Sequence, residues 1–196
     1  FTVAGLLHNE PSFKKYYTIL IQNQEKVNEI ITLINEESKT SVALFSDNMR
    51  EIDFSQFKPR SYYANHYILE PYFKVMMWFG KISIVLDNKE GATHFSDEDL
   101  HRMAILTAMI AQTVKEADVI EEMKHMEDVF QLLIGKQDNI SLFEVIEIMD
   151  EMNITADKLT NKGTYEEFLH QLLELKSSNQ LYSSQILKSN PLSPKQ

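Results

Sequence analysis

Apolar residues recur at intervals of three and four positions along four segments of the chain, which is the pattern of helices with one buried face. The first segment spans residues 12–37. The longest spans residues 96–133, where Ser96 is a suitable N-cap before three acidic residues. Two shorter segments follow at residues 141–152 and 164–176. At about 1.5 Å per residue the longest helix would reach about 50 Å, so we expect its far end to pack on another chain or on the C-terminal segment.

The middle of the chain shows a different pattern, in which β-branched and aromatic residues form short runs between turn residues. Runs at residues 42–45 and 49–54 predict a hairpin. Further strands are predicted within residues 67–86, where Gly80 and Lys81 would form a tight turn. The order of these elements predicts an α+β fold: an antiparallel sheet flanked by an N-terminal helix and a long helix, followed by a small helical C-terminal region.

Charge and cysteine content exclude several classes of function. The chain has 196 residues, with 29 Asp and Glu against 19 Lys and Arg and a net charge of −10. We therefore expect neither nucleic acid nor an anionic membrane to be a partner. Cysteine is absent, which excludes disulfides and thiolate chemistry and leads us to expect a reducing, cytoplasmic location. No apolar run approaches the roughly 18 residues of a membrane span.

Three histidines follow a glutamate by three positions, a spacing that places both side chains on one face of a helix, as in metal-carrying bundles. The pairs are Glu98 with His101, Glu122 with His125, and Glu167 with His170. The alternative, which we favour, is that they lie on solvated faces of acidic helices. No nucleophile elbow, phosphate-binding glycine loop or His-Glu-x-x-His motif is present. We therefore predict no enzyme activity, no cofactor and no bound metal, and keep a metal-binding protein or enzyme that uses Glu-x-x-His pairs as an alternative.

A dense group of aromatic residues lies in the predicted second half of the sheet. These residues could line a pocket and stack on a planar ligand, or they could be ordinary core. The candidate ligand-binding residues are Tyr62, Tyr63, Tyr67, Tyr72 and Trp78.

Residues 80–89 (GKISIVLDNK) and 95–100 (FSDEDL) resemble the end of a GAF domain, a sensory module related to PAS domains. In the cyclic-nucleotide-binding members the signature is Asn-Lys, then Phe, then Asp-Glu. Leu100 replaces the last acidic residue. The resemblance implies a structural role, with the Lys and the Asp pairing, for the four matching residues: Asn88, Lys89, Phe95 and Asp99.

The resemblance also implies a division of the chain. We expect an N-terminal extension at residues 1–11, a GAF-like domain at 12–120, a helical extension at 121–176 and a polar tail or linker at 177–196. Residues 57–68 leave no room for a third strand and the pocket helices of a GAF domain, so the domain would be reduced in its ligand-pocket segment. The first seven residues lack the basic start of a signal peptide, and we expect a fragment of a larger protein.

In GAF-containing signalling proteins the flanking helices commonly form a dimer. By that resemblance we predict a non-catalytic regulatory or protein-interaction module that forms a homodimer, or binds a protein partner, through its terminal helices. The expected interface residues are Ile110, Val114, Ala117, Ile120 and Met123. On this view, changing Val114 and Met123 together to Glu should give a folded monomer. The alternative is a sensor for a small molecule such as a nucleotide, bound among the aromatic residues.

Overall fold

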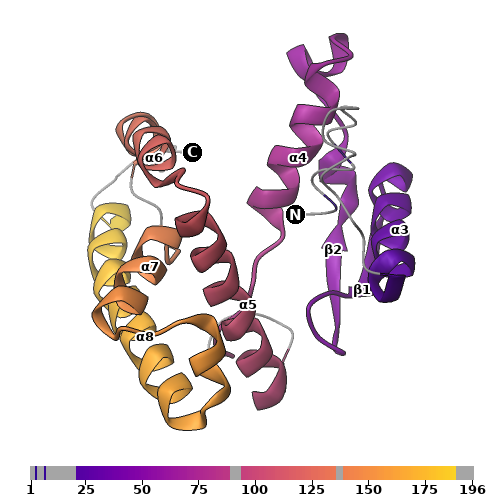
Figure 1. Ribbon diagram of the computed structural model, residues 1–196. Coiled ribbons are helices and arrows are strands. Elements are labelled where there is room, and N and C mark those ends of the chain that lie inside the picture. Colours follow the sequence, from indigo (N-terminus) through magenta and orange to yellow (C-terminus); the bar gives the residue numbers. More distant parts are fainter. Residues whose placement is uncertain (1–2, 4–6, 8–20, 89–93, 136–138, 189–196) are drawn as a thin grey trace. The chain divides into compact units, whose positions relative to one another are not determined.

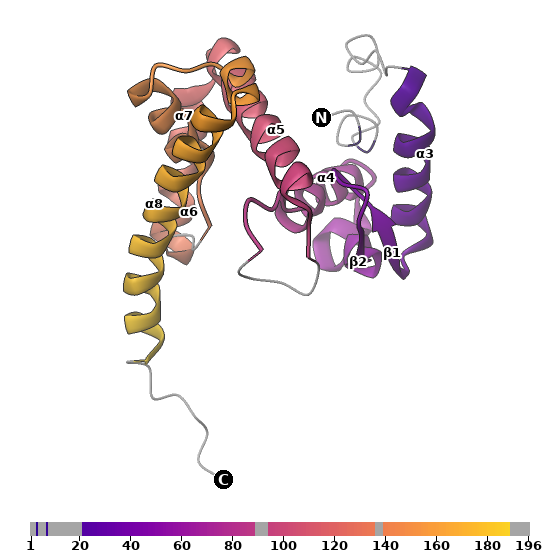
Figure 2. The same cartoon turned by 90° about the horizontal axis from the view of Figure 1, so that it is seen from below.

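A computed structural model of the chain describes residues 3, 7, 21–88, 94–135 and 139–188. The chain divides into two compact units, unit 1 (residues 1–95) and unit 2 (residues 96–196). Each unit is described by itself below (Figures 1 and 2).

Unit 1 combines a hairpin with helices. Its elements in chain order are α3 (Ile21–Glu36), β1 (Lys39–Ala43), β2 (Met49–Asp53), the 3-10 helices η1 (Phe54–Phe57) and η2 (Ser61–Asn65), and α4 (Leu69–Lys81). The strands are antiparallel, with Lys39 opposite Asp53 and Ala43 opposite Met49. This confirms the predicted hairpin. In Figures 1 and 2 the hairpin lies between α3 and α4.

One hydrophobic core holds unit 1 together. Its aromatic centre is Phe54 and Phe57, whose ring centroids lie 5.7 Å apart. Both rings are inaccessible to solvent because η1 folds back under α3 directly after β2. The buried members are Val3, Leu7, Ile30, Ile34, Val42, Leu44, Phe54, Phe57 and Trp78.

The strands predicted within residues 67–86 are wrong, because most of this segment forms α4. Aromatic and β-branched residues favour strands only weakly, and burial of one helical face overrides that preference. Pro71 is compatible with the helix because it lies in the first turn, where an amide has no partner within the helix. Gly80 and Lys81 belong to the last turn of α4 and do not form a hairpin turn.

Unit 2 is helical in its described part. Its elements are α5 (Asp97–Glu116), α6 (Ile120–Ile134), α7 (Leu142–Glu151), the 3-10 helix η3 (Ala156–Thr160) and α8 (Lys162–Lys188). The helix starts that the sequence predicts are confirmed at two caps. The hydroxyl of Ser96 accepts a hydrogen bond from the Asp99 amide (3.1 Å), and Ser141 forms a reciprocal capping box with Glu144.

The single long helix predicted over residues 96–133 is also wrong, because it is divided into α5 and α6. The Ala117 amide makes the last helical hydrogen bond of α5, to the Thr113 carbonyl at 3.0 Å. Asp118 then adopts a left-handed backbone conformation, with φ of 55°, which ends the helix. α8, by contrast, continues through Lys188, past the end predicted at residue 176.

α5 packs against α7, η3 and α8, and Figure 1 shows α7 beside both α5 and α8. A row of small buried residues on α5, Ala104, Ala108 and Ala111, allows the neighbouring backbones to approach closely. Because α5 packs against elements that follow it, the division into units falls at residue 95 and not at the predicted residue 120. The described chain is thus a mixed α+β protein, mostly helical, with a two-stranded antiparallel sheet.

Candidate interaction surface

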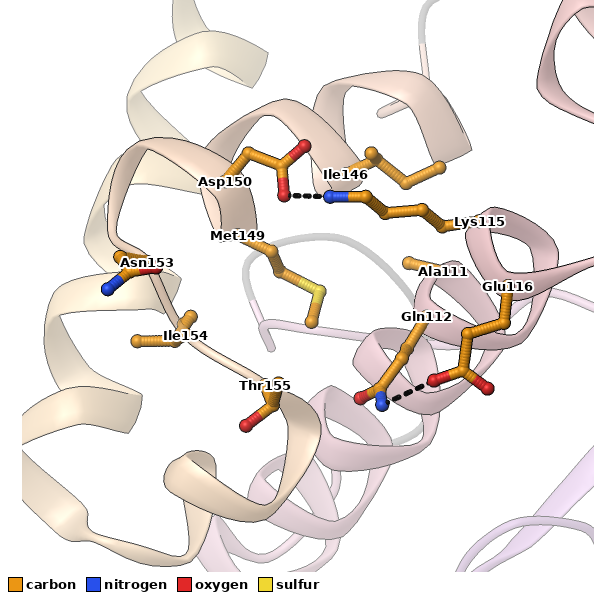
Figure 3. A pocket seen from close by; sticks show the side chains of 10 residues that line it. All are labelled: Ala111, Gln112, Lys115, Glu116, Ile146, Met149, Asp150, Asn153, Ile154 and Thr155. Carbon is orange, nitrogen blue, oxygen red and sulfur yellow. Dashed lines mark hydrogen bonds and ion pairs between the residues drawn. The ribbon is translucent and has the colours of Figure 1, made fainter. Parts of the chain in front are cut away.

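A hollow of about 390 Å³ opens between the C-terminal half of α5 and the end of α7 (Figure 3). Buried Ala111, Ile146 and Met149 give it an apolar surface, together with half-buried Ile154. The remaining lining side chains are polar: Gln112, Lys115, Glu116, Asp150, Asn153 and Thr155.

Four of the polar side chains in this hollow are paired with one another. Lys115 forms an ion pair with Asp150 across the opening between α5 and α7 (Figure 3). The Gln112 side chain donates to Glu116 (2.8 Å) and accepts from the Ala156 amide (3.2 Å), which ties α5 to η3. With these groups paired, the space that remains suits an apolar side chain better than an ion.

A defined helix end shapes the far wall of the hollow. Asn153 has φ of 52°, and its amide donates to the Asp150 carbonyl (3.1 Å). The next amide, of Ile154, donates to the Met149 carbonyl (2.9 Å). These two bonds form a Schellman motif, which turns the chain sharply from α7 towards η3.

α6 carries the most exposed apolar residues of unit 2. Met126, Val129 and Leu133 are spaced by three and four positions, so they share one side of the helix, here named the α6 apolar face. Leu133 is 74% exposed. Leu132 is 86% exposed but lies outside this face, about 100° around the helix from Leu133.

The opposite side of α6 is polar and faces the start of α7. It lines a second hollow, of about 400 Å³, together with residues from the α6–α7 connection and the first turn of α7. The lining residues are Lys124, Glu127, Asp128, Gln131, Asn139, Ser141, Phe143 and Glu144. Several polar side chains of α6 thus line this second hollow, while Met126, Val129 and Leu133 lie on the opposite side of the helix.

The interface residues predicted from the sequence do not form one accessible surface. Val114 is buried within unit 2, while Ala117 is exposed and Ile110, Ile120 and Met123 are partly buried. The proposed change of Val114 to Glu would place a carboxylate in the core, so it does not test association. The predicted interface set ends at Met123 and so does not include Met126, Val129 and Leu133, which lie further along α6.

The five residues expected to line an aromatic pocket lie in different surroundings. Trp78 is buried in the core of unit 1, whereas Tyr62 and Tyr67 are 83% and 81% exposed. Tyr63 packs beside Tyr72, with ring centroids 6.3 Å apart. None of the five residues lines either hollow described above.

Residues expected from the GAF resemblance have local structural roles. The Asn88 side chain donates to the Phe95 carbonyl (2.8 Å) and accepts from its amide (2.9 Å), which joins the two ends of this segment. Asp99 is buried and accepts a hydrogen bond from the Ser96 hydroxyl (2.8 Å). Lys89, and with it the expected pairing of Lys89 with Asp99, lies outside the described residues.

Three residues of the Glu-x-x-His pairs lie beside groups outside their own pair. His101 Nε2 lies 2.6 Å from the Leu159 carbonyl, and His170 lies 3.7 Å from Glu174. Glu98 lies 3.7 Å from Arg102. Within the described part of the chain no group of three His, Asp or Glu residues is placed to hold a metal ion.

Two pKa shifts accompany the packing of η3 and α8. Burial raises the pKa of the Tyr165 phenol, and the nearby carboxylates of Asp97 and Glu166 add to the shift. A hydrogen bond from the Thr155 hydroxyl lowers the pKa of the Asp157 carboxyl.

The fold and these surfaces define a mixed α+β protein with an outward apolar helix face. A family model described as "Protein of unknown function (DUF3160)" matches residues 1–196, so the chain belongs to this family. No curated protein and no solved structure matches the chain. Among the described residues, no helix combines the length and apolar character that crossing a membrane would require.

Proposed function

We propose that the protein is a non-catalytic interaction module, whose unit 2 binds an amphipathic helix of a partner protein on the α6 apolar face. The observation that carries this proposal is the exposed α6 apolar face, which lies on the side of α6 opposite the polar second hollow. Burying one such side chain against a partner contributes about 1.5–3 kcal/mol to the free energy of binding. Three of them in a row supply the centre of a helix-on-helix contact.

Charge selects the kind of partner. Residues 96–196 contain 18 Asp and Glu against 9 Lys and Arg, so unit 2 carries nearly all of the net charge of −10. On α6, Glu122 lies one turn before Met126 on the same side of the helix, whereas Glu127 and Asp128 line the second hollow with Lys124. Two copies of such a surface repel each other, whereas a partner helix with Lys or Arg beside its apolar face is attracted.

A regulatory role and a cytoplasmic location belong to the same proposal. The GAF-like domain proposed for residues 12–120 has support in the paired hydrogen bonds between Asn88 and Phe95, two residues of its motif. The absence of cysteine supports a reducing compartment. The interaction through α6 depends on neither of these features.

The test uses the full chain and two synthetic peptides that share a leucine face, one flanked by lysines and one by glutamates. We expect the lysine-flanked peptide to bind more tightly. Leu133→Glu should weaken this binding at least about ten-fold, which corresponds to about 1.4 kcal/mol, because it places a carboxylate in the apolar contact. Leu132→Glu is the matched control, with the same substitution one residue away, and should change binding by less than about two-fold.

Isothermal titration calorimetry measures the binding, and circular dichroism checks that both variants fold. Equal losses of peptide affinity in Leu133→Glu and Leu132→Glu would contradict a contact centred on the α6 apolar face. Sedimentation equilibrium of the chain alone adds a second check. Self-association that Leu133→Glu abolishes would identify a second copy of the chain as the occupant and overturn the basic partner.

A further inference from the structure

We propose that Arg50 of unit 1 binds the carboxylate of a small monocarboxylic acid through one edge of its guanidinium group. The observation that carries this proposal is a buried pair of donors. In the part of the chain that the structure describes, neither Nε nor Nη2 of Arg50 has a hydrogen-bond partner, and each atom exposes less than 1 Å². The third nitrogen, Nη1, donates to the Ser83 carbonyl at 2.8 Å.

Arg50 lies on the face of the hairpin that packs on the core. It is directly opposite Val42 in the register of β1 and β2, and residues opposite one another share a face of the sheet. Val42 is buried in the core of unit 1, and Ile52, two residues beyond Arg50 and on the same face, packs against that core. An apolar residue at position 50 would avoid the cost of an unpaired buried charge, so the arginine suits binding better than folding.

Phe45 and Ser83 hold the guanidinium in place before a ligand binds. The guanidinium carbon lies 5.6 Å from the centre of the Phe45 ring, within the range of a cation–π contact. Phe45 has φ of 65°, a left-handed conformation that is rare for bulky residues and that persists only where the surroundings impose it. With the hydrogen bond to Ser83, this contact leaves Arg50 little side-chain freedom to lose on binding.

No carboxylate among the described residues offsets the charge of Arg50. Burial lowers the pKa of its guanidinium, and no acidic neighbour raises that pKa in return. A guanidinium nevertheless keeps its proton in proteins. Arg50 is therefore a permanent cation without a counter-charge, and an anion is the class of ligand that it fits.

The number of free donors selects a carboxylate among anions. The N–H groups of Nε and Nη2 point the same way in the planar fork, so they match the two oxygens of one carboxylate. A phosphate would add a further oxygen and up to a second negative charge, for which these two donors offer no partner. The apolar residues on the same face of the hairpin suit an aliphatic chain behind the carboxylate.

The chain beside Ser83 offers a way in. Ser83 is exposed, and residues 82–88 form neither a helix nor a strand. A small outward movement of this stretch uncovers the guanidinium without breaking an element of secondary structure.

The test uses the full chain, with sodium hexanoate as the probe and a saturation-transfer NMR titration as the readout. We expect Arg50→Met to weaken hexanoate binding at least about ten-fold, because it removes the cation and both donors. Arg50→Lys should also weaken it, because lysine keeps the charge but lacks the planar fork. Arg60→Met is the matched control, with the same substitution at an exposed arginine of unit 1, and should bind within about two-fold of the wild type.

Urea unfolding separates ligand binding from a structural role. Arg50→Met should be at least as stable as the wild type, because it removes an uncompensated buried charge. Hexanoate should raise the stability of the wild type but not that of this variant. Leu133→Glu should bind hexanoate as the wild type does, since the site does not involve the α6 apolar face.

Three results would overturn the proposal. The first is equal hexanoate binding by wild type and Arg50→Met, or no binding by the wild type. The second is displacement of hexanoate by the neutral analogue hexanamide, which would show that the charge is not recognised. The third is tighter binding of inorganic phosphate than of hexanoate at Arg50, which would replace the carboxylate with a phosphate.

Discussion

At the scale of single residues, His101 and Tyr165 connect three elements of unit 2. The Leu159 carbonyl can only accept a hydrogen bond, so His101 Nε2 carries the proton and donates across the 2.6 Å between them. The imidazole ring also packs against Tyr165, with centroids 4.2 Å apart. His101 on α5 thus contacts both η3 and α8. His101, which the sequence suggested as a metal ligand, therefore has a structural role in unit 2.

The raised pKa of Tyr165 predicts a loss of stability at alkaline pH. Burial favours the neutral phenol in the folded state, so the folded pKa lies above the unfolded value of about 10. The contribution to stability is complete below the unfolded pKa and is lost as pH rises through the folded pKa. Tyr165→Phe removes this dependence. We expect its free energy of unfolding to rise relative to wild type between about pH 9 and 11.

Urea unfolding at several pH values measures this difference. Tyr62→Phe, which removes an exposed phenol from unit 1, controls for the loss of one tyrosine. A difference between Tyr165→Phe and wild type that stays constant with pH would contradict the predicted linkage.

At the scale of elements, left-handed residues decide where two helices of unit 2 end. Asp118 ends α5 and Asn153 ends α7, with φ of 55° and 52°. Asp and Asn adopt this conformation more readily than other non-glycine residues, since their short polar side chains can bond locally. The points at which the chain leaves α5 and α7 therefore depend on Asp118 and Asn153, two residues of modest helix propensity.

Substitution of Asn153 should show this directly. Asn153→Ala should lower the free energy of unfolding by about 1 kcal/mol, because alanine is strained in the left-handed region. Asn153→Gly should change it by less than about 0.5 kcal/mol, because glycine reaches that region without steric cost. Thermal or urea unfolding provides the measurement. Glu151→Ala, in the last turn of α7, is the control for loss of a polar side chain there. Equal stability of the Ala and Gly variants would refute the role of φ at this position.

The elements that the sequence predicted correctly are those with a local cause. Ser96 and Ser141 provide caps within three residues of the amides that they bind, and the β1–β2 hairpin closes over a short polar turn. α4 was missed because its aromatic residues suit either a strand or a helix. The choice between the two depends on burying Trp78 in the core of unit 1, which is not a local property.

At the scale of the whole molecule, charge is distributed unevenly. Residues 1–95 contain 10 Lys and Arg against 11 Asp and Glu, so unit 1 is nearly neutral while unit 2 is strongly acidic. Charge therefore favours a basic partner for unit 2 and favours neither sign for unit 1.

Salt should reveal this electrostatic selection. Raising NaCl from about 50 to about 500 mM shortens the Debye length from roughly 14 to 4 Å. We expect the affinity of the lysine-flanked peptide for the wild-type chain to fall several-fold over this range. A glutamine-flanked peptide with the same leucine face is the control, and its affinity should fall little over the same range of salt. Equal salt sensitivity of both peptides would argue against charge as the source of specificity.

The sequence by itself determined the acidic composition, the absence of thiol chemistry, the helix caps and the hairpin, because each of these depends on composition or on residues close together in the chain. It also indicated that the region beyond residue 116 carries apolar residues at helical spacing. Only the tertiary structure decided which apolar residues are buried. Val114 is buried, whereas Leu133 and Met76 are exposed. The break at Asp118 separates the helix that carries Val114 from the one that carries Leu133, and the helical form of α4 determines the side on which Met76 lies.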